Sequence, residues 1–220
     1  MTTAIAPATV RIVADGAALT GDLVVPTGAR GIVAFAHGSG SSRLSPRNRF
    51  VAETLSEAGL ATLLIDLLTP DEDAADQLTR ELRFDIALLA RRMTAVVDEL
   101  GRDERLRTLR IGLFGASTGA AAALIAAADR PDLVRAVVSR GGRPDLADRA
   151  LERVRAPTLL IVGGADREVL SLNRRALWQL LSPANELHIV PGATHLFEEP
   201  GALAAVAHLA SAWFRRHLAR

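Results

Sequence analysis

The stretch Leu109–Ala127, reading LRIGLFGASTGAAAALIAA, decides the fold of this 220-residue chain. An apolar run ends in the turn Gly115-Ala116-Ser117-Thr118-Gly119, and an alanine-rich segment follows at once. This order predicts a strand, a very tight turn and a helix. In the pattern G-x-S-x-G, the small neighbours allow strand and helix to approach closely while the serine is held in a strained backbone conformation. The Ser117 hydroxyl would then stand clear of the sheet, beside the first N–H groups of the helix.

The pattern alone is equally consistent with an ordinary strand-to-helix turn, because glycine and alanine are abundant in this chain. A serine hydroxyl is a poor nucleophile at neutral pH and needs a histidine base oriented by a carboxylate. The value of the motif therefore depends on whether an acid and a histidine follow at the ends of later strands.

Apolar strand-like runs alternate with helical segments along the whole chain, which predicts a mostly parallel sheet with helices on both faces. The expected strands are Thr9–Ala14, Leu19–Val25, Gly31–Ala36, Leu60–Leu67, Ile111–Phe114, Val134–Ser139, Thr158–Val162 and Glu186–Val190. The expected helices are Pro46–Ala58, a long one from Pro70 to Leu100, the alanine-rich one after Ser117, a short one at Pro144–Val154, Leu170–Leu181 and Glu199–Leu218. Eight strands with an antiparallel start in one domain over residues 1–220 are the order of an α/β-hydrolase.

Asp166 and His195 each follow a predicted strand, in the chain order Ser117, Asp166, His195. The carboxyl ends of parallel strands meet at one edge of a sheet, so these three side chains are expected to converge there. Asp66 also follows a strand and competes for the acid role, although it precedes the serine in the sequence. The sequence thus predicts a triad of Ser117 as nucleophile, His195 as general base and Asp166 as orienting acid.

The loop His37-Gly38-Ser39-Gly40, after the third strand, is expected to supply part of an oxyanion hole. One donor would be the backbone N–H of Thr118 and the other that of Ser39, with Gly40 as the alternative. His37 is expected to be structural and to bond the backbone of its own loop.

Several residues at the same edge are candidates for substrate binding. Arg140 and Arg143 could hold a carboxylate as a fork, although a solvated loop, or pairing of Arg140 with Asp66 or Asp145, remains open. Leu68 and Phe197, together with Leu44 and Leu196, could form apolar walls, and Gly40 is a further candidate for substrate binding. The segment Leu67–Arg83 is short and acidic, so we expect a small or absent lid and a shallow pocket suited to short esters.

Four motifs carry a resemblance that spans essentially the whole chain: HGSG at 37–40, GASTG at 115–119, GGAD at 163–166 and GATH at 192–195. With them the chain resembles the α/β-hydrolase superfamily, and within it the dienelactone hydrolase-like group. The resemblance implies a cofactor-free hydrolase of small carboxylic esters or lactones, using the predicted triad. Domains of this kind also resemble those found beside phosphoribosyltransferase domains.

One departure from the group concerns the nucleophile. Dienelactone hydrolases proper use a cysteine, whereas this elbow carries Ser117 and the chain contains no cysteine. The resemblance therefore favours a serine esterase over an enzyme for dienelactone itself. An acyltransferase with the same triad, or a non-catalytic small-ligand-binding member of the fold, are the alternatives.

Composition limits the remaining classes. The 26 basic residues, all arginine, nearly balance 25 acidic ones, so we expect no nucleic-acid partner. The absence of cysteine removes thiolate metal sites and disulfides, and no metal site is expected. Met1–Arg11 lacks a secretory signal pattern and no apolar run is long enough for a membrane helix, so a cytoplasmic monomer or homodimer is expected.

Overall fold

The computed structural model describes residues 7–218, so the first six residues of the segment examined for a secretory signal lie outside it. Eight strands form one sheet in the order β1-β2-β4-β3-β5-β6-β7-β8. The β1/β2 and β2/β4 pairs are antiparallel and all others are parallel. The strands are β1 (Ala8–Ala14), β2 (Ala17–Val24), β3 (Gly31–Ala36), β4 (Ala61–Ile65), β5 (Arg110–Ala116), β6 (Val134–Arg140), β7 (Thr158–Gly163) and β8 (Glu186–Val190). This is the predicted α/β-hydrolase architecture.

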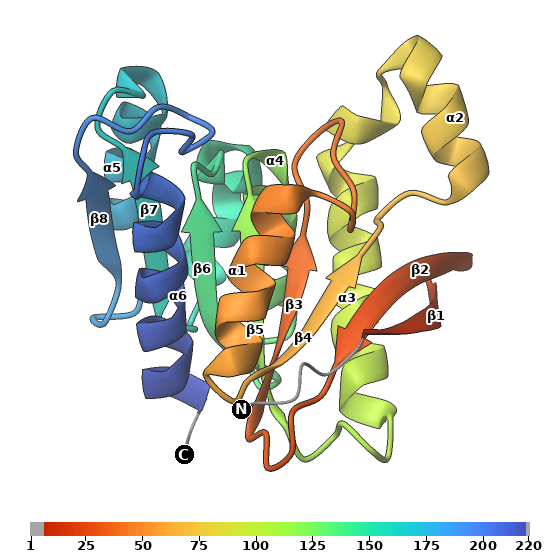
Figure 1. Cartoon of the computed structure of the whole chain (residues 1–220). Helices are drawn as coiled ribbons and strands as arrows, with labels where there is room; N and C mark the ends of the chain where they lie inside the picture. Colours follow the sequence, from red (N-terminus) through yellow and green to blue (C-terminus); the bar gives the residue numbers. More distant parts are fainter. Residues whose placement is uncertain (1–6, 219–220) are drawn as a thin grey trace.

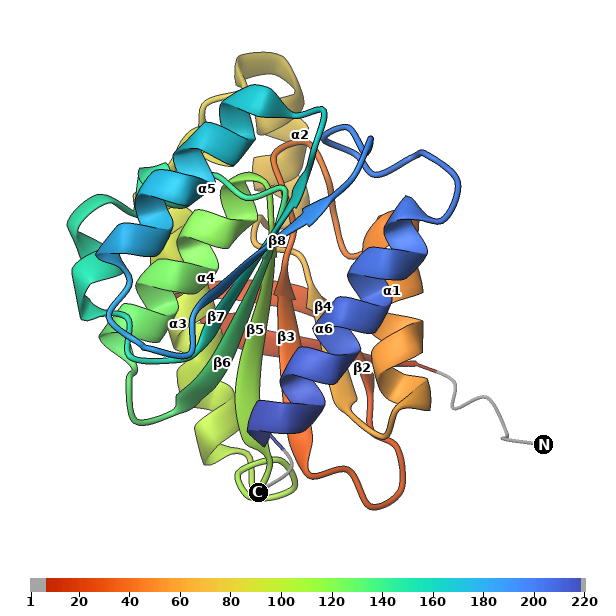
Figure 2. The same cartoon turned by 90° about the vertical axis from the view of Figure 1, so that its left-hand side faces the viewer.

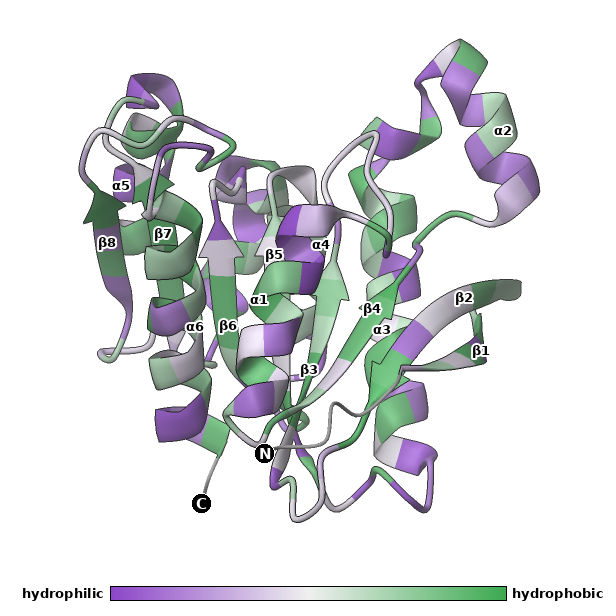
Figure 3. Cartoon of the chain, in the orientation of Figure 1, coloured by the Kyte–Doolittle hydropathy of each residue, from purple (hydrophilic) through white to green (hydrophobic). Residues whose placement is uncertain are grey.

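Helices cover both faces of the sheet, as Figures 1 and 2 show. The helices α1 (Pro46–Glu57) and α6 (Ala202–Leu218) pack together on one face. The opposite face carries α3 (Ile86–Arg102), α4 (Thr118–Asp129) and α5 (Arg167–Gln179), together with the 3-10 segment η2 (Pro144–Arg153). Because both faces are covered, the central strands β3 and β5 are apolar and almost wholly buried, as their hydrophobic colouring in Figure 3 reflects.

The predicted long helix from Pro70 to Leu100 is wrong, because the chain breaks it into three parts. These are α2 (Pro70–Thr79), the 3-10 turn η1 (Leu82–Phe84) and α3. Arg80 adopts a left-handed conformation (φ 60°) that ends α2, and the Asp85 side chain accepts a hydrogen bond from the Leu88 N–H and so caps α3. The break could not be recognised in the sequence, because the leucines keep a regular spacing across it. In Figure 1, α2 projects from the edge of the sheet.

The start of α2 is built as its sequence indicates. The Thr69 hydroxyl accepts from the Glu72 N–H, and the Glu72 carboxylate accepts from the Thr69 N–H, which forms a capping box. Arg92 on α3 binds both carboxylate oxygens of Glu72 and the carbonyl of Leu67. These bonds fasten the base of α2 to α3.

The short helix predicted at Pro144–Val154 is present as the 3-10 segment η2, which has a kink at Asp148 (φ 45°). Within residues 7–218, no helix is both long enough and apolar enough to span a bilayer.

Candidate active site

The serine elbow lies where β5 passes into α4. Ser117 has φ 49° and ψ −121°, a conformation that side chains other than glycine rarely adopt. A Cβ on Gly119 would lie 2.3 Å from the Ala36 carbonyl oxygen, and one on Gly115 would lie 2.3 Å from the Ala120 Cα. Only glycine fits at either position, so the spacing of the motif is enforced by backbone contact.

The turn after β6 holds the backbone of the elbow in place. The Ser117 N–H donates to the Arg140 carbonyl (3.2 Å), and the Arg143 N–H donates to the Ser117 carbonyl (3.0 Å). The strain at Ser117 is therefore balanced by hydrogen bonds on both sides of the residue.

Asp166 and His195 lie together at the ends of β7 and β8. The distance from His195 Nδ1 to Asp166 Oδ2 is 2.7 Å, and the side chains are 39% and 14% exposed respectively. Backbone bonds join the two loops that carry them, from the Gly164 N–H to the Val190 carbonyl (2.8 Å) and from the Ala165 N–H to the Ala193 carbonyl (3.0 Å). The carboxylate thus fixes the ring so that Nε2 is available to accept a proton.

Gly141 connects this pair to the elbow. It follows Arg140, whose carbonyl binds the Ser117 N–H, and a Cβ at Gly141 would lie 3.6 Å from Cε1 of His195. No direct hydrogen bond between the Ser117 hydroxyl and the His195 ring occurs in the described part of the chain. In sites without substrate this bond is often long and tightens when substrate binds.

The expected oxyanion donors lie side by side, but one of them is engaged. α4 begins at Thr118, so the N–H groups of its first turn have no partner within the helix. The Ser39 N–H donates to the Thr118 hydroxyl at 2.9 Å. Gly40, the alternative donor, has φ 68° and its Cα faces the Arg83 guanidinium, since a Cβ there would lie 3.1 Å from Arg83 Nη1.

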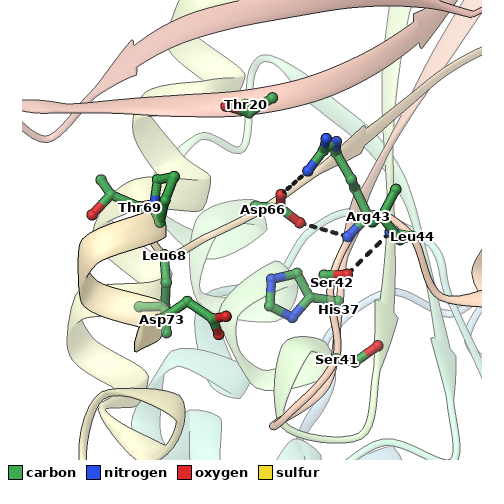
Figure 4. Close-up of a pocket in the computed structure, with 11 residues that line it drawn as sticks. Thr20, His37, Ser41, Ser42, Arg43, Leu44, Asp66, Leu68, Thr69 and Asp73 are labelled. Atoms are coloured by element: carbon green, nitrogen blue, oxygen red, sulfur yellow. Dashed lines mark hydrogen bonds and ion pairs between the residues drawn. The ribbon is translucent and has the colours of Figure 1, made fainter. Parts of the chain in front are cut away.

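A pocket of ≈ 320 Å³ opens between the loop after β3 and the start of α2 (Figure 4). Leu68 and His37 are among its lining residues. Ser117 and His195 are not among its lining residues. Its volume is large enough for a small ligand.

His37 has the structural role that its position suggested. Its Nδ1–H donates to the Gly38 carbonyl (3.0 Å), and Nε2 accepts from the Leu67 N–H (3.1 Å). Burial lowers the pKa of His37 below its usual value despite the nearby Asp66 carboxylate. The ring is therefore neutral and joins the loop after β3 to the end of β4.

The other candidates differ in their surroundings. Asp66 accepts from both the backbone N–H and the guanidinium of Arg43 (Figure 4), so it serves the loop after β3, whereas His195 pairs with Asp166. Arg143 forms a two-point pair with Asp145, at 2.9 and 2.7 Å. Phe197 is 1% exposed and packs in the core under α1 and α6, which corrects its expected place in an open pocket wall.

Two features of the site were not predicted from the sequence. Thr194 donates to Glu199 Oε1 through its N–H (3.0 Å) and its hydroxyl (2.6 Å), and this clamp closes the loop that carries His195. The second feature is Asp76 on α2, which holds Arg83 over Gly40. Burial opposes the ionisation of Asp76, but the hydrogen bonds from Arg83 outweigh that effect and lower the Asp76 pKa. No cluster of metal-ligating side chains occurs between residues 7 and 218.

The profile of the Dienelactone hydrolase family matches residues 19–218. The crystal structure of dienelactone hydrolase from Anabaena variabilis is 59% identical, with a TM-score of 0.95 over 96% of this chain and 98% of that one. Est1E from Butyrivibrio proteoclasticus, solved with ferulic acid bound, is 19% identical with a TM-score of 0.80 over 96% of this chain and 100% of that one, and shares the fold.

Two curated relatives from strains of Mycobacterium tuberculosis carry the name putative phosphoribosyl transferase. Each is 58% identical over 210 residues, which cover 95% of this chain and 46% of the relative. The chain therefore spans about half the length of these relatives.

Proposed function

Since the chain belongs to the dienelactone hydrolase family, we propose that it is a serine hydrolase of small carboxylic esters or lactones. Family membership and the hydrolase structural neighbours support hydrolase activity in general. The finer assignment rests mainly on one observation: strained Ser117 directly precedes α4, beside a loop that carries His195, which is bonded at 2.7 Å to Asp166. The name of the longer relatives describes proteins of which this chain covers 46%.

The proposed reaction begins with attack of the Ser117 hydroxyl oxygen on the ester carbonyl carbon. His195 Nε2 accepts the hydroxyl proton, while Nδ1–H continues to donate to Asp166, which stabilises the imidazolium. The tetrahedral intermediate collapses when the C–O bond to the alcohol breaks and His195 returns the proton to the departing oxygen. Water then attacks the acyl-enzyme by the same steps in reverse, and releases the acid and free Ser117.

The intermediate carries a negative oxygen that needs fixed donors, each worth about 3 kcal/mol. We assign the Thr118 N–H, at the start of α4, and the Ser39 N–H to this role. The Thr118 hydroxyl binds the Ser39 N–H at 2.9 Å and so keeps the loop after β3 against the elbow. When the substrate oxygen arrives, it replaces this hydroxyl as the acceptor of the Ser39 N–H.

The choice of small substrates rests on the family match, because the pocket beside the loop after β3 is not lined by Ser117 or His195. We propose a small-molecule ester as the partner of this site, and a cytoplasmic location for the reaction.

The test is the hydrolysis of p-nitrophenyl acetate by the purified chain and by Ser117→Ala. We expect the variant to lose at least about 1,000-fold in kcat while its circular dichroism spectrum and thermal unfolding stay close to those of the original protein. Ser182→Ala, in the loop that enters β8 at the other edge of the sheet, is the matched control and should retain full activity. Undiminished turnover by Ser117→Ala would contradict the proposal. Product analysis with an added alcohol separates hydrolysis from acyl transfer.

A further inference from the structure

Arg140 is a buried cation that has no counter-ion among residues 7–218. The residue is 8% exposed, and its Nε and Nη1 atoms form no hydrogen bond within residues 7–218. Arg92, which is 3% exposed, shows the usual arrangement, because both of its terminal nitrogens bind the Glu72 carboxylate. Burying a charge without a counter-ion costs several kcal/mol, so packing alone gives no reason for an arginine at this position.

The surroundings of Arg140 add positive charge. Burial and the nearby Arg47 lower the pKa of Arg140 to about 10, so the guanidinium remains protonated at neutral pH. Arg47 lies in the first turn of α1, a turn with no acidic residue, and the helix N-terminus contributes further positive potential. Glu198 reaches Arg47 only at 3.4 Å in an exposed pair, which offsets little of this charge. The region is therefore electrostatically prepared for an anion.

Arg140 also lies next to the reacting groups. It is the last residue of β6, and its Cα is in register with Ala116, the neighbour of Ser117. Its carbonyl binds the Ser117 N–H, and the next residue, Gly141, approaches the His195 ring. Side chains alternate along a strand, so Arg140 shares the face of Val138, which is the face that α6 covers.

We propose that Arg140, with Arg47 beside it, binds an oxyanion carried by the substrate and so selects esters that bear a carboxylate or a phosphate. This inference rests on the proposed function, because it assigns a specificity group to the same site. A planar guanidinium with unused N–H donors binds either anion at two points, which a lone ammonium does not do. The bound anion would supply the counter-charge that no residue between 7 and 218 gives to Arg140.

The kinetic test compares mono-4-nitrophenyl succinate, whose acyl part ends in a carboxylate, with its neutral methyl ester. We expect kcat/KM to favour the anionic ester by about 10- to 100-fold, mainly through KM. Arg140→Met should reduce this ratio to about one, mainly through a rise in KM for the anionic ester. Arg140→Lys should keep only part of the preference, because it retains the charge and loses the fork.

Thermal unfolding supplies a readout that does not depend on catalysis. Replacing an unpaired buried charge by methionine should leave the unfolding temperature unchanged or raise it. Succinate and inorganic phosphate should each be tested as ligands, and the one that raises the unfolding temperature more identifies the preferred anion. Arg140→Met should abolish that rise, whereas Arg153→Met, which removes a surface pair with Asp129, should preserve it.

The outcomes separate this inference from the proposed function. Turnover of both esters without any preference, together with no stabilisation by either anion, would overturn the assignment of Arg140 and leave the hydrolase proposal standing. Failure to hydrolyse any ester would contradict the proposed function, and the anion-dependent stabilisation would then decide the role of Arg140 by itself. A fall in unfolding temperature for Arg140→Met with an unchanged ester ratio would show that the residue is purely structural.

Discussion

Replacement of Gly119 by alanine should damage the site without removing any reacting group. The new Cβ would lie 2.3 Å from the Ala36 carbonyl oxygen and 2.4 Å from that of His37, both backbone atoms at the end of β3. Ordinary contact begins near 3.4 Å, so the elbow and the loop after β3 must separate by about 1 Å. A displacement of this size costs about 100-fold in rate, and the overpacking costs about 1–3 kcal/mol of unfolding free energy.

The matched control is the same substitution at Gly101, in the last turn of α3. There the Cβ would meet only Leu133 side-chain atoms, at 3.6 Å or more, and alanine favours the helix by up to about 1 kcal/mol. The assay measures kcat/KM for p-nitrophenyl acetate and urea unfolding for both variants. We expect Gly119→Ala to lose both activity and stability, and Gly101→Ala to lose neither. A Gly119→Ala enzyme within threefold of the original activity would refute the close contact between β3 and α4 at the elbow.

Two further substitutions test the acid of the triad and the attachment of α2. Asp166→Asn should lower kcat by about 10⁴, because the amide favours the wrong tautomer of His195. The unfolding temperature should stay nearly unchanged. Steady-state kinetics measure the effect, and a variant that keeps more than a tenth of the original activity would exclude Asp166 as the orienting acid. The hydrogen bonds from Arg92 lower the pKa of Glu72 from 4.5 to about 2, so the ionised form stabilises the fold above pH 4.5 and this stabilisation is lost as the pH falls towards 2. The Glu72 carboxylate is 31% exposed, so solvent screens part of this effect. Glu72→Gln should therefore lower the free energy of unfolding by about 1–2 kcal/mol at pH 7 and by almost nothing near pH 2. If urea unfolding shows the same difference at every pH, the result would count against the ion pair.

The parts of the site that follow from local backbone geometry could be predicted from the sequence. Gly115 and Gly119 flank Ser117 at the only spacing that lets β5 and α4 touch, so the motif reports the elbow directly. Asp166 and His195 follow strands of a parallel sheet, and the carboxyl ends of parallel strands lie at one edge of the sheet. These constraints depend on the local sequence of each segment, so they can be recognised in the sequence.

The features that were missed depend on contacts between distant segments. The break at Arg80 lies inside a regular run of leucines, and Leu78, which fits that run, is 87% exposed on α2. The bond from the Ser39 N–H to the Thr118 hydroxyl joins residues that are 79 positions apart. Equally, the sequence gives Arg140 and Arg143 the same appearance, and only burial and the presence of Asp145 distinguish them.

The most direct test of the central claim is covalent labelling of the protein with a fluorophosphonate, followed by mass spectrometry of its peptides. Arginine-specific cleavage that spares the Arg130-Pro131 bond gives a fragment of residues 111–135, in which Ser117 is the only serine. We predict one phosphonyl group per chain, located on Ser117, and no adduct in Ser117→Ala. An unlabelled protein, or a label that persists in Ser117→Ala, would contradict the assignment of Ser117 as the nucleophile.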